Sequence, residues 1–338
     1  MTSLYYPDWE TLDIRDLPVP AAGENEVLLK VAACGICGSE LESFKHRSPR
    51  RPPPLVMGHE FCGTVVDNRS HDDAFAVGRK VISNSIISCG LCTTCKSGNA
   101  HLCEQRKVFG MHRPGAFAAY VAVPASTLIQ WPDELAAESA CLSEPLANGI
   151  HVAHSLAHRK PELVLVIGAG PIGLMCQQAL QVLIGSKTIV SDISPLRLEV
   201  AKQLGAHAIA NPLYNEVDEI ISKLTNGRGV DAVVDAVGSR TTKEQSLRLV
   251  RAGGAVVWIG LQENTIPIDT YSVTLLEKTI YGSYAATNEE LRQAAAMMAA
   301  GTVDVSSWVQ TYPLQDGVAA FERMVHAKGS DIKAVLVP

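Results

Sequence analysis

Four cysteines in the spacing Cys-x2-Cys-x2-Cys-x7-Cys constrain the fold of this chain more than any other feature; they are Cys89, Cys92, Cys95 and Cys103. Four thiolates so close together match the donors of a closed tetrahedral Zn²⁺ site. The alternative is a disulfide framework, which needs an oxidising compartment, and the first residues do not resemble a secretory signal. We therefore expect a structural zinc lobe at about residues 88–104. Because a closed site leaves no coordination position open, the chemistry of the protein must lie elsewhere.

Length and charge exclude several classes of protein. A chain of 338 residues is too long for one ordinary hydrophobic core, so two domains are expected. The formal charge of −6 argues against a general nucleic-acid surface. No apolar stretch approaches the roughly 20 residues that a membrane span needs. Nine cysteines without a secretory signal indicate a reducing compartment. We expect a soluble cytoplasmic protein with no nucleic-acid or membrane partner.

Local patterns divide the chain into three stretches. Up to about residue 130, glycine and proline punctuate short strands, as in a small barrel or sandwich, and these are expected at 26–33, 61–66, 80–87 and 116–123. From Pro161, strands alternate with helices, which is typical of a parallel sheet covered on both faces. Its strands are expected at 162–167, 188–191, 231–236 and 254–261, and its helices at 172–183 and 195–204. After about residue 285, an Ala-rich helix at 288–300 and a final strand at 334–337 are expected to rejoin the first domain.

A glycine-rich loop links the first strand and helix of the second stretch. It comprises Gly168, Ala169, Gly170, Pro171, Ile172 and Gly173. Such glycines allow a tight turn and a close approach to a pyrophosphate, whose charge then lies at the helix N-terminus. Asp192 follows Gly173 by nineteen residues, where a carboxylate can accept hydrogen bonds from ribose hydroxyls and repel a 2′-phosphate. A structural turn and a helix cap are the simpler alternatives, but the combined spacing favours a dinucleotide, NAD rather than NADP.

A second group of metal-binding residue types lies before the cysteine lobe. Cys37, His59 and Glu60 offer a thiolate, an imidazole and a carboxylate, the usual ligands of a catalytic Zn²⁺ with one open position. Taken singly, they could be a small buried residue, a core histidine and a surface charge. Their appearance together with the lobe and the glycine loop favours a second metal site.

These motifs together resemble those of the zinc-dependent medium-chain dehydrogenases/reductases, the alcohol and polyol dehydrogenase superfamily. The resemblance also includes Gly35-Ile36-Cys37-Gly38-Ser39, Gly58-His59-Glu60, the run from Gly115 to Tyr120, and Glu144-Pro145-Leu146. Ser-Glu-Pro-Leu at 143–146 resembles the sorbitol, galactitol-phosphate and threonine dehydrogenase branches. The resemblance implies a fold of class α/β plus β. A GroES-like catalytic domain (1–146 and 286–338) is then split around a Rossmann NAD-binding domain (147–285).

The resemblance also implies roles for single residues. Cys37, His59 and Glu60 would bind a catalytic zinc, and Glu144 would either join them or hold zinc-bound water, giving two zinc ions per chain with the lobe. Ser39 resembles the hydroxyl that takes the substrate proton. Two further positions are similar to cofactor contacts, Asn148 at the nicotinamide and Arg197 beside the adenosine ribose. From the residues alone, these last three could also be ordinary hydrogen-bonding or solvated side chains.

Two residues depart from the pattern of the family. Glu40 stands where the family usually has Asp, and Glu42 where it often has His. If Glu40 orients His59, its additional methylene must be accommodated by a backbone shift. Glu42 could still pass on a proton as a carboxylate, or the relay could end in water.

The implied reaction is reversible oxidation of a secondary alcohol to a ketone, with hydride transfer to NAD. A low aromatic content of 5% favours a polar polyol, sugar or sugar derivative. The loop 45–54 carries four Lys or Arg residues that could bind a phosphate, although a solvated loop is the simpler interpretation. His112 and Arg113 are further possible substrate contacts. The alternatives are a threonine-type amino-alcohol dehydrogenase and a non-catalytic zinc scaffold or redox sensor. A homodimer or homotetramer is implied, with a small alcohol or ketone as the only other partner.

Overall fold

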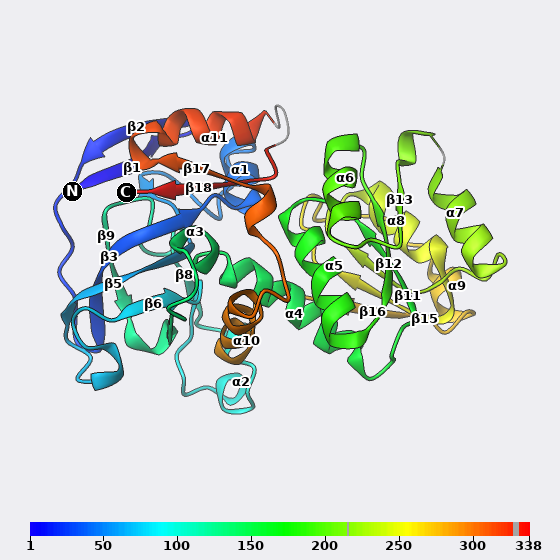
Figure 1. Cartoon of the computed structure of the whole chain (residues 1–338), viewed down its shortest axis with the longest axis horizontal. Coiled ribbons are helices and arrows are strands. Elements are labelled where there is room, and N and C mark those ends of the chain that lie inside the picture. Colours follow the sequence, from blue (N-terminus) through cyan, green and yellow to red (C-terminus); the bar gives the residue numbers. More distant parts are fainter. Residues whose placement is uncertain (215, 327–330) are drawn as a thin grey trace. The chain divides into compact units, whose positions relative to one another are not determined.

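The computed structural model describes residues 1–214, 216–326 and 331–338, and the chain forms two compact units (Figure 1). Unit 1 comprises Met1–Ala147 and Ala285–Pro338, and unit 2 comprises Asn148–Tyr284. Among the described residues, no helix has the length and apolar character that crossing a membrane requires.

Unit 1 is built on a seven-stranded sheet. The strands run in the order β10-β6-β5-β3-β18-β17, and β9 also pairs with β3. Their bounds are Leu128–Gln130 for β10, Lys80–Ser83 for β6, Glu60–Asn68 for β5, Glu26–Gly35 for β3, Lys333–Val337 for β18, Val309–Pro313 for β17 and Tyr120–Pro124 for β9. The final strand β18 lies antiparallel to β3, with Leu336 opposite Cys34. The end of the chain therefore rejoins the first domain, as its sequence predicts.

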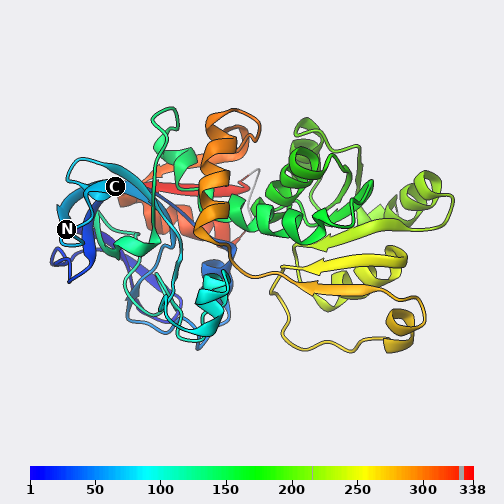
Figure 2. The same ribbon diagram turned by 90° about the horizontal axis from the view of Figure 1, so that it is seen from below.

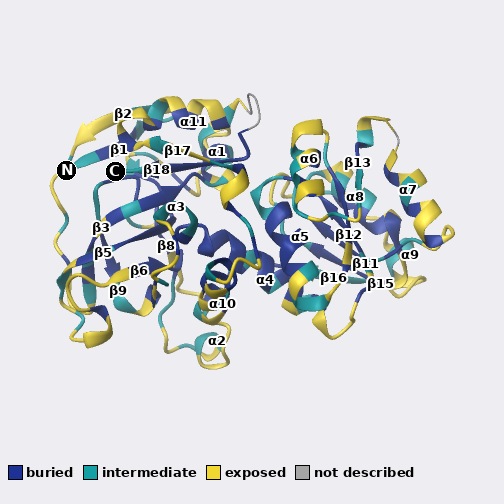
Figure 3. Cartoon of the chain, in the orientation of Figure 1, coloured by how far each residue is buried: buried dark blue, intermediate teal, exposed yellow. Residues whose placement is uncertain are grey.

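A smaller sheet and one helix cover the hydrophobic core of unit 1. The hairpin of β1 (Thr2–Asp8) and β2 (Thr11–Asp16) is extended by β4 (Leu55–Val56), and the helix is α11 (Gly317–Val325). Large side chains from distant segments fill the core with no exposed surface; they include Leu4, Tyr6, Phe61, Phe117 and Phe321. Figure 3 shows this buried interior in dark blue. The sequence analysis did not predict the hairpin.

The predicted bounds of two strands in unit 1 are wrong in part. The run 80–87 is not one strand: β6 ends at Ser83, and β7 (Ile86–Ile87) pairs instead with β8 (Lys107–Val108). The side chain of Asn84 causes this break, because its amide oxygen accepts from the backbone N–H of Ile86 at 2.9 Å. The run 116–123 becomes a strand only at Tyr120. Before it, the N–H groups of residues 115–117 bond to the carbonyls of residues 56–58 and brace the turn before His59.

Unit 2 is a six-stranded parallel sheet in the order β13-β12-β11-β14-β15-β16. Its strands are β11 (Leu163–Ile167), β12 (Lys187–Ser191), β13 (Ala208–Ala210), β14 (Val230–Asp235), β15 (Val250–Trp258) and β16 (Thr279–Gly282). Its helices after β11 are α5 (Pro171–Ile184), α6 (Pro195–Gln203), α7 (Glu216–Thr225), α8 (Arg240–Leu249) and α9 (Thr270–Thr274). If these strands are numbered 1 to 6 as they occur along the chain, they lie side by side in the sheet in the order 3-2-1-4-5-6. This is a doubly wound arrangement, with helices on both faces of the sheet (Figure 2).

Apolar runs explain the central strands of this sheet. Consecutive residues of β11, β14 and β15 are fully buried, as in Val164-Leu165-Val166 and Val233-Val234, because helices cover both faces. Parallel strands all present their carboxyl ends at one edge, which is where ligands of such sheets bind. Gly168 and Asp192 directly follow β11 and β12, so both lie at this edge.

Candidate metal centres and nucleotide site

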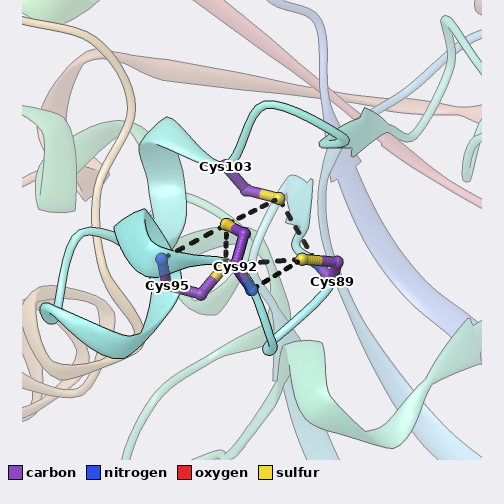
Figure 4. A group of neighbouring side chains, drawn as sticks. All are labelled: Cys89, Cys92, Cys95 and Cys103. Atoms are coloured by element: carbon purple, nitrogen blue, oxygen red, sulfur yellow. Dashed lines mark hydrogen bonds between the residues drawn. The ribbon is translucent and has the colours of Figure 1, made fainter.

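The four cysteines of the lobe come together at one point. Their sulfur atoms are turned toward one another (Figure 4) and all lie within 4.8 Å of each other. Cys92 Sγ is 3.4 Å from Cys95 Sγ and 4.0 Å from Cys103 Sγ. Cys92 caps the short helix α2 (Thr93–Lys96), which carries Cys95. This is the donor set of a tetrahedral Zn²⁺ site.

Backbone N–H groups stabilise the thiolates of this lobe. The N–H of Cys92 donates to Cys89 Sγ at 3.4 Å, and the N–H of Cys89 donates to Cys103 Sγ at 3.4 Å. Backbone hydrogen bonds from Leu91 and Cys92 lower the pKa of Cys89 to about 6. Zinc binds the thiolate rather than the thiol, so the lowered pKa of Cys89 suits a metal, whereas burial and the hydrogen bond with Cys92 raise the pKa of Cys95 to about 12.

The second group brings together Cys37, His59 and Glu60. One ligand atom from each lies within 4.8 Å of the others. Cys37 caps helix α1 (Gly38–Lys45), His59 precedes β5, and Glu60 is the first residue of β5. Gly58 makes the turn before them with φ +98°, and a Cβ there would lie 2.7 Å from the backbone nitrogen of Phe117. Only glycine fits this turn, so Gly58 fixes where His59 emerges.

Glu40 ties both segments of this group together. The side chain is fully buried, and its Oε1 lies 2.8 Å from His59 Nδ1 and accepts from the N–H of Gly58 at 2.8 Å. Its Oε2 accepts from the N–H of Cys37 at 3.0 Å, as in a capping box. The side chain of Glu40 is one methylene longer than the Asp that is usual at this position in the family. Its carboxylate bonds to Cys37 and to His59 at once.

Electrostatics reinforce the Glu40–His59 contact. Burial alone would raise the pKa of Glu40, but the charge of His59 and its hydrogen bond lower that pKa to about 2. Burial opposes a charge on His59, whereas Glu40 and Cys37 raise the pKa of this imidazole well above its usual value. The site therefore favours a positive charge at the position of the His59 ring.

Glu60 is paired with a lysine that the sequence analysis missed. Lys333, on β18, forms an ion pair with Glu60 Oε2, and both side chains are 1% exposed. Its Nζ also donates to the carbonyl of Ile36 at 2.8 Å. Burial opposes the charge of Lys333, but Glu60 raises the pKa of this ammonium. The available signal was a charged residue inside the apolar run from Ile332 to Val337.

Glu144 lies near this group and has its own partner. It is on helix α4 (Ser143–Ala157), and the hydroxyl of Ser85 donates to its Oε1 at 2.5 Å. Burial raises the pKa of Glu144, and the charge of Glu60 raises it further while that of His59 opposes the shift. Glu144 is not one of the three residues whose ligand atoms lie within 4.8 Å of one another. No sequence signal identified Ser85.

Helix α1 places Ser39 at the surface beside the group. Its hydroxyl donates to Cys37 Sγ at 3.4 Å, and the residue is exposed. Glu42, on the next turn, has its carboxylate 3.2 Å from the ring of exposed His46. Ser39, Glu42 and His46 therefore follow one another along one face of the helix.

The basic loop 45–54 differs in part from the solvated loop that we expected. Arg47 pairs with Glu10 at the surface. Arg51, in contrast, is fully buried and donates to the carbonyls of Gly110 at 2.7 Å and Ser39 at 2.8 Å. Arg51 therefore holds helix α1 in place and cannot bind a phosphate at the surface.

The two residues named as further possible substrate contacts have local partners. Arg113 pairs with Glu26 at 2.8 Å and donates to the carbonyl of Ala122 at 2.7 Å. The Nδ1 of His112 accepts from the N–H of Val108 at 3.1 Å.

The glycine loop has the geometry that a dinucleotide requires. Gly168 adopts φ +98°, and a Cβ on Gly173 would overlap the carbonyl of Gly168. Gly170 caps α5, Pro171 is at its first position, and Ile172 follows. A Cβ on Gly170 would meet no atom within 4 Å. The space beyond the helix N-terminus is therefore open for an anion.

Asp192 closes this loop from the neighbouring strand. Its Oδ2 accepts from the N–H of Ala169 at 2.7 Å and its Oδ1 from the N–H of Ser194 at 2.8 Å. Ser194, rather than Asp192, caps α6 and accepts from the N–H of Arg197 at 3.4 Å. The side chains of Arg197 and of Asn148, on α4, are half-buried.

Two family models match the chain. "Alcohol dehydrogenase GroES-like domain" matches residues 23–133, and "Zinc-binding dehydrogenase" matches residues 171–300. They confirm the predicted fold class, a GroES-like domain together with a Rossmann-type parallel sheet.

Similar proteins cover most of the chain. It is 33% identical to D-arabitol-phosphate dehydrogenase of Enterococcus avium (98% of this chain, 95% of the relative). It is also 33% identical to sorbitol dehydrogenase of Bacillus subtilis (97% and 94%) and to L-threonine 3-dehydrogenase of Chelativorans sp. (89% and 88%).

Solved structures superpose closely on this one. A crystal structure assigned to the zinc-binding dehydrogenases, from Sinorhizobium meliloti and bound to NADP, is 30% identical with a TM-score of 0.91 over 100% of this chain and 99% of that one. The alcohol dehydrogenase RspB of Escherichia coli CFT073, complexed with NADH, is 26% identical with a TM-score of 0.91 over the same shares.

Proposed function

We propose, from the premise that the chain belongs to the zinc-binding dehydrogenases of the alcohol dehydrogenase superfamily, that it oxidises a secondary alcohol to a ketone, reversibly, with zinc and NAD. Membership of this family makes the chain an oxidoreductase, as the sequence predicts. The observation that carries the specific reaction is the convergence of Cys37, His59 and Glu60, a donor set that leaves a coordination position for substrate.

The donors of both clusters fit Zn²⁺. Cys37, His59 and Glu60 would hold a catalytic ion with Glu144 beside it, and the four lobe cysteines would hold a structural ion. A catalytic zinc supplies a Lewis acid that lowers the pKa of a hydroxyl bound to it. Glu40 contributes by fixing the ring of His59 through Nδ1, so that Nε2 is left for the metal.

Ser39 would receive the proton of the alcohol. Its hydroxyl is beside Cys37 Sγ and exposed to solvent, so it can accept a proton from one side and release it on the other. Glu42, on the same face of α1, would carry this proton to water. A carboxylate can serve here in place of the histidine found in the resembling family.

The cofactor would bind at the carboxyl edge of the sheet in unit 2. Gly168, Gly170 and Gly173 shape the loop for a pyrophosphate at the N-terminus of α5. Asp192 supports NAD rather than NADP, because its carboxylate would repel a 2′-phosphate. Arg197 would lie beside the adenosine ribose and Asn148 beside the nicotinamide, which accepts the hydride. Unit 1 would then be the catalytic domain and unit 2 the NAD-binding domain.

A polyol, a sugar or a sugar derivative is the proposed substrate. Similarity to D-arabitol-phosphate and sorbitol dehydrogenases supports this class. A threonine-type activity is the second candidate, because the similarity to an L-threonine 3-dehydrogenase is equally high. We further propose that the protein is a homodimer or homotetramer. We also propose a reducing, cytoplasmic compartment, since the cysteines of both clusters can bind metal only in their reduced form.

Metal analysis and a substrate panel test this proposal together. Purified protein should contain about two zinc ions per chain, and NADH absorbance at about 340 nm should rise with NAD and polyols, sugar phosphates or L-threonine. A preference among these substrates distinguishes the two candidates. One zinc per chain and no turnover with any alcohol would instead indicate a non-catalytic scaffold.

A further inference from the structure

The Glu60–Lys333 ion pair lies inside unit 1, directly beside the proposed catalytic metal ligands. Glu60 is adjacent in sequence to His59, and Lys333 belongs to the C-terminal strand β18. The two side chains are 1% exposed, so water contributes little to the solvation of either charge. A buried charge of this kind requires a partner of opposite sign.

Gly35 reserves the space for this pair. A Cβ at residue 35 would collide with Glu60 Oε2 and lie 3.0 Å from Lys333 Cε. Lys333 is also fixed by its hydrogen bond to the carbonyl of Ile36, the residue before Cys37. The ammonium group is therefore anchored next to the ligand-bearing segment.

Glu60 thus lies between two cation positions. Its Oε2 is bound to Lys333, while the residue also presents a carboxylate oxygen within 4.8 Å of the ligand atoms of Cys37 and His59. One carboxylate carries one negative charge, so the ammonium and a metal ion would compete for it. With Lys333 in place, Glu60 is already neutralised and gains less from coordination.

We propose that Lys333 is a positioning residue that competes with the metal ion for the carboxylate of Glu60 and so keeps Glu60 a weakly bound, exchangeable ligand. The inference rests on the proposed catalytic zinc. Without Lys333, the metal becomes the nearest cation, and Glu60 coordinates it firmly. A carboxylate that is held this firmly no longer exchanges, and in this respect the site would resemble a structural zinc site rather than a catalytic one.

Cobalt substitution tests the inference without relying on turnover. Co²⁺ replaces zinc, and its visible absorption bands report the number and type of ligands; the Cys37→Ser variant supplies the spectral background of the lobe. In Lys333→Met, we expect a changed spectrum and a metal affinity at the Cys37 site increased by about tenfold or more. Adding Glu60→Gln should abolish this gain in affinity, because the carboxylate for which Lys333 competes is gone.

Two further variants separate positioning from structural support. Lys333→Arg keeps the charge and should retain the original spectrum. Lys243→Met removes another buried lysine, 3.5 Å from Asp235 in unit 2, and should leave the cobalt spectrum unchanged. If Lys333→Met does not fold without metal, Zn²⁺ added during refolding should restore it, because the ion replaces the missing cation.

The outcomes distinguish the two proposals. A spectrum and an affinity unchanged in Lys333→Met, or a failure of zinc to restore its folding, would overturn the role of Lys333 alone. If the unsubstituted protein binds no Co²⁺ beyond the amount bound by Cys37→Ser, the catalytic metal itself is refuted.

Discussion

The two cysteine-containing clusters of unit 1 differ in how their ligands are held. The lobe draws its four ligands from residues 89–103, and backbone N–H groups stabilise their sulfur atoms. The second group draws its ligands from the start of α1 and the start of β5, and its charged neighbours Glu144 and Lys333 come from α4 and β18, which are distant in sequence. A local site depends on the path of one short segment, whereas an assembled site depends on the packing of the whole domain.

Because of this difference, we expect the two sites to depend on their metal ions in different ways. Three of the four lobe thiols are only half-buried, and the apolar side chains of Leu91 and Leu102 are exposed, so zinc should supply much of the stability of the lobe. The second group lies beside the large hydrophobic core of unit 1, and protein contacts hold its residues: Glu40 binds His59, and Lys333 pairs with Glu60. Loss of its metal should therefore cost chemistry more than folding.

Cys37→Ser should give the largest effect on activity. Removing one ligand forfeits the Lewis acid, and several kcal/mol of transition-state stabilisation corresponds to a fall in kcat/KM of about 10³-fold or more. Zinc content should fall from about two ions per chain to one, with the circular dichroism spectrum and the melting temperature nearly unchanged. Full activity in this variant would contradict the proposed mechanism.

Cys103→Ser should reverse that pattern. Cys103 is fully buried and is the last ligand of the lobe. Its loss should lower the free energy of unfolding by about 3 kcal/mol, measured by thermal and denaturant unfolding. Per folded molecule, kcat should change far less than in Cys37→Ser. A variant that melts normally but has lost its turnover would show that the lobe takes part in the reaction.

Glu40→Gln should weaken metal binding at the assembled site alone. The pKa of Glu40 is about 2, so it is ionised at any working pH, and a neutral amide cannot support His59 equally. Zinc affinity at this site should fall by about 10–100-fold, measured by chelator competition, with the lobe unaffected. Glu42→Gln, on the exposed face of the same helix, is the control and should retain its zinc affinity. Equal losses in the two variants would indicate a general charge effect.

The same contrast explains how much of the fold the sequence could predict. Four strands of unit 2, β11, β12, β14 and β15, were placed to within a few residues, because continuous apolar runs such as Leu163–Ile167 have few alternatives. The two edge strands, β13 and β16, were not predicted. The β1–β2 hairpin was missed, since its burial comes from a distant partner rather than from its own pattern. The break after Ser83 depends on the side chain of Asn84, which binds back to the chain at Ile86 and cannot be inferred from hydrophobicity.

The candidate sites were predictable to a similar extent. The spacing of the lobe cysteines was sufficient, because all of its ligands belong to one segment. For the assembled site, motifs identified Cys37, His59 and Glu60, but Lys333 and Ser85 come from segments that carry no metal-ligand pattern. Lys333 and Glu60 are 273 positions apart in the sequence. They meet because of the register of β18 against β3, which only the folded chain defines.

Ser85→Ala should give the smallest effect and shows how finely the assembled site is adjusted. The hydroxyl of Ser85 donates to Glu144 Oε1 at 2.5 Å, and its removal should cost about 1 kcal/mol, or roughly fivefold in kcat/KM. Zinc content should remain at about two ions per chain, because Ser85 is not a ligand.

Ser83→Ala is the matched control: it removes an equally buried hydroxyl that bonds to Thr127 and not to Glu144. If both variants lower kcat/KM equally, the Ser85 contact is only a core hydrogen bond. A loss confined to Ser85→Ala would show that the orientation of Glu144 matters to the reaction.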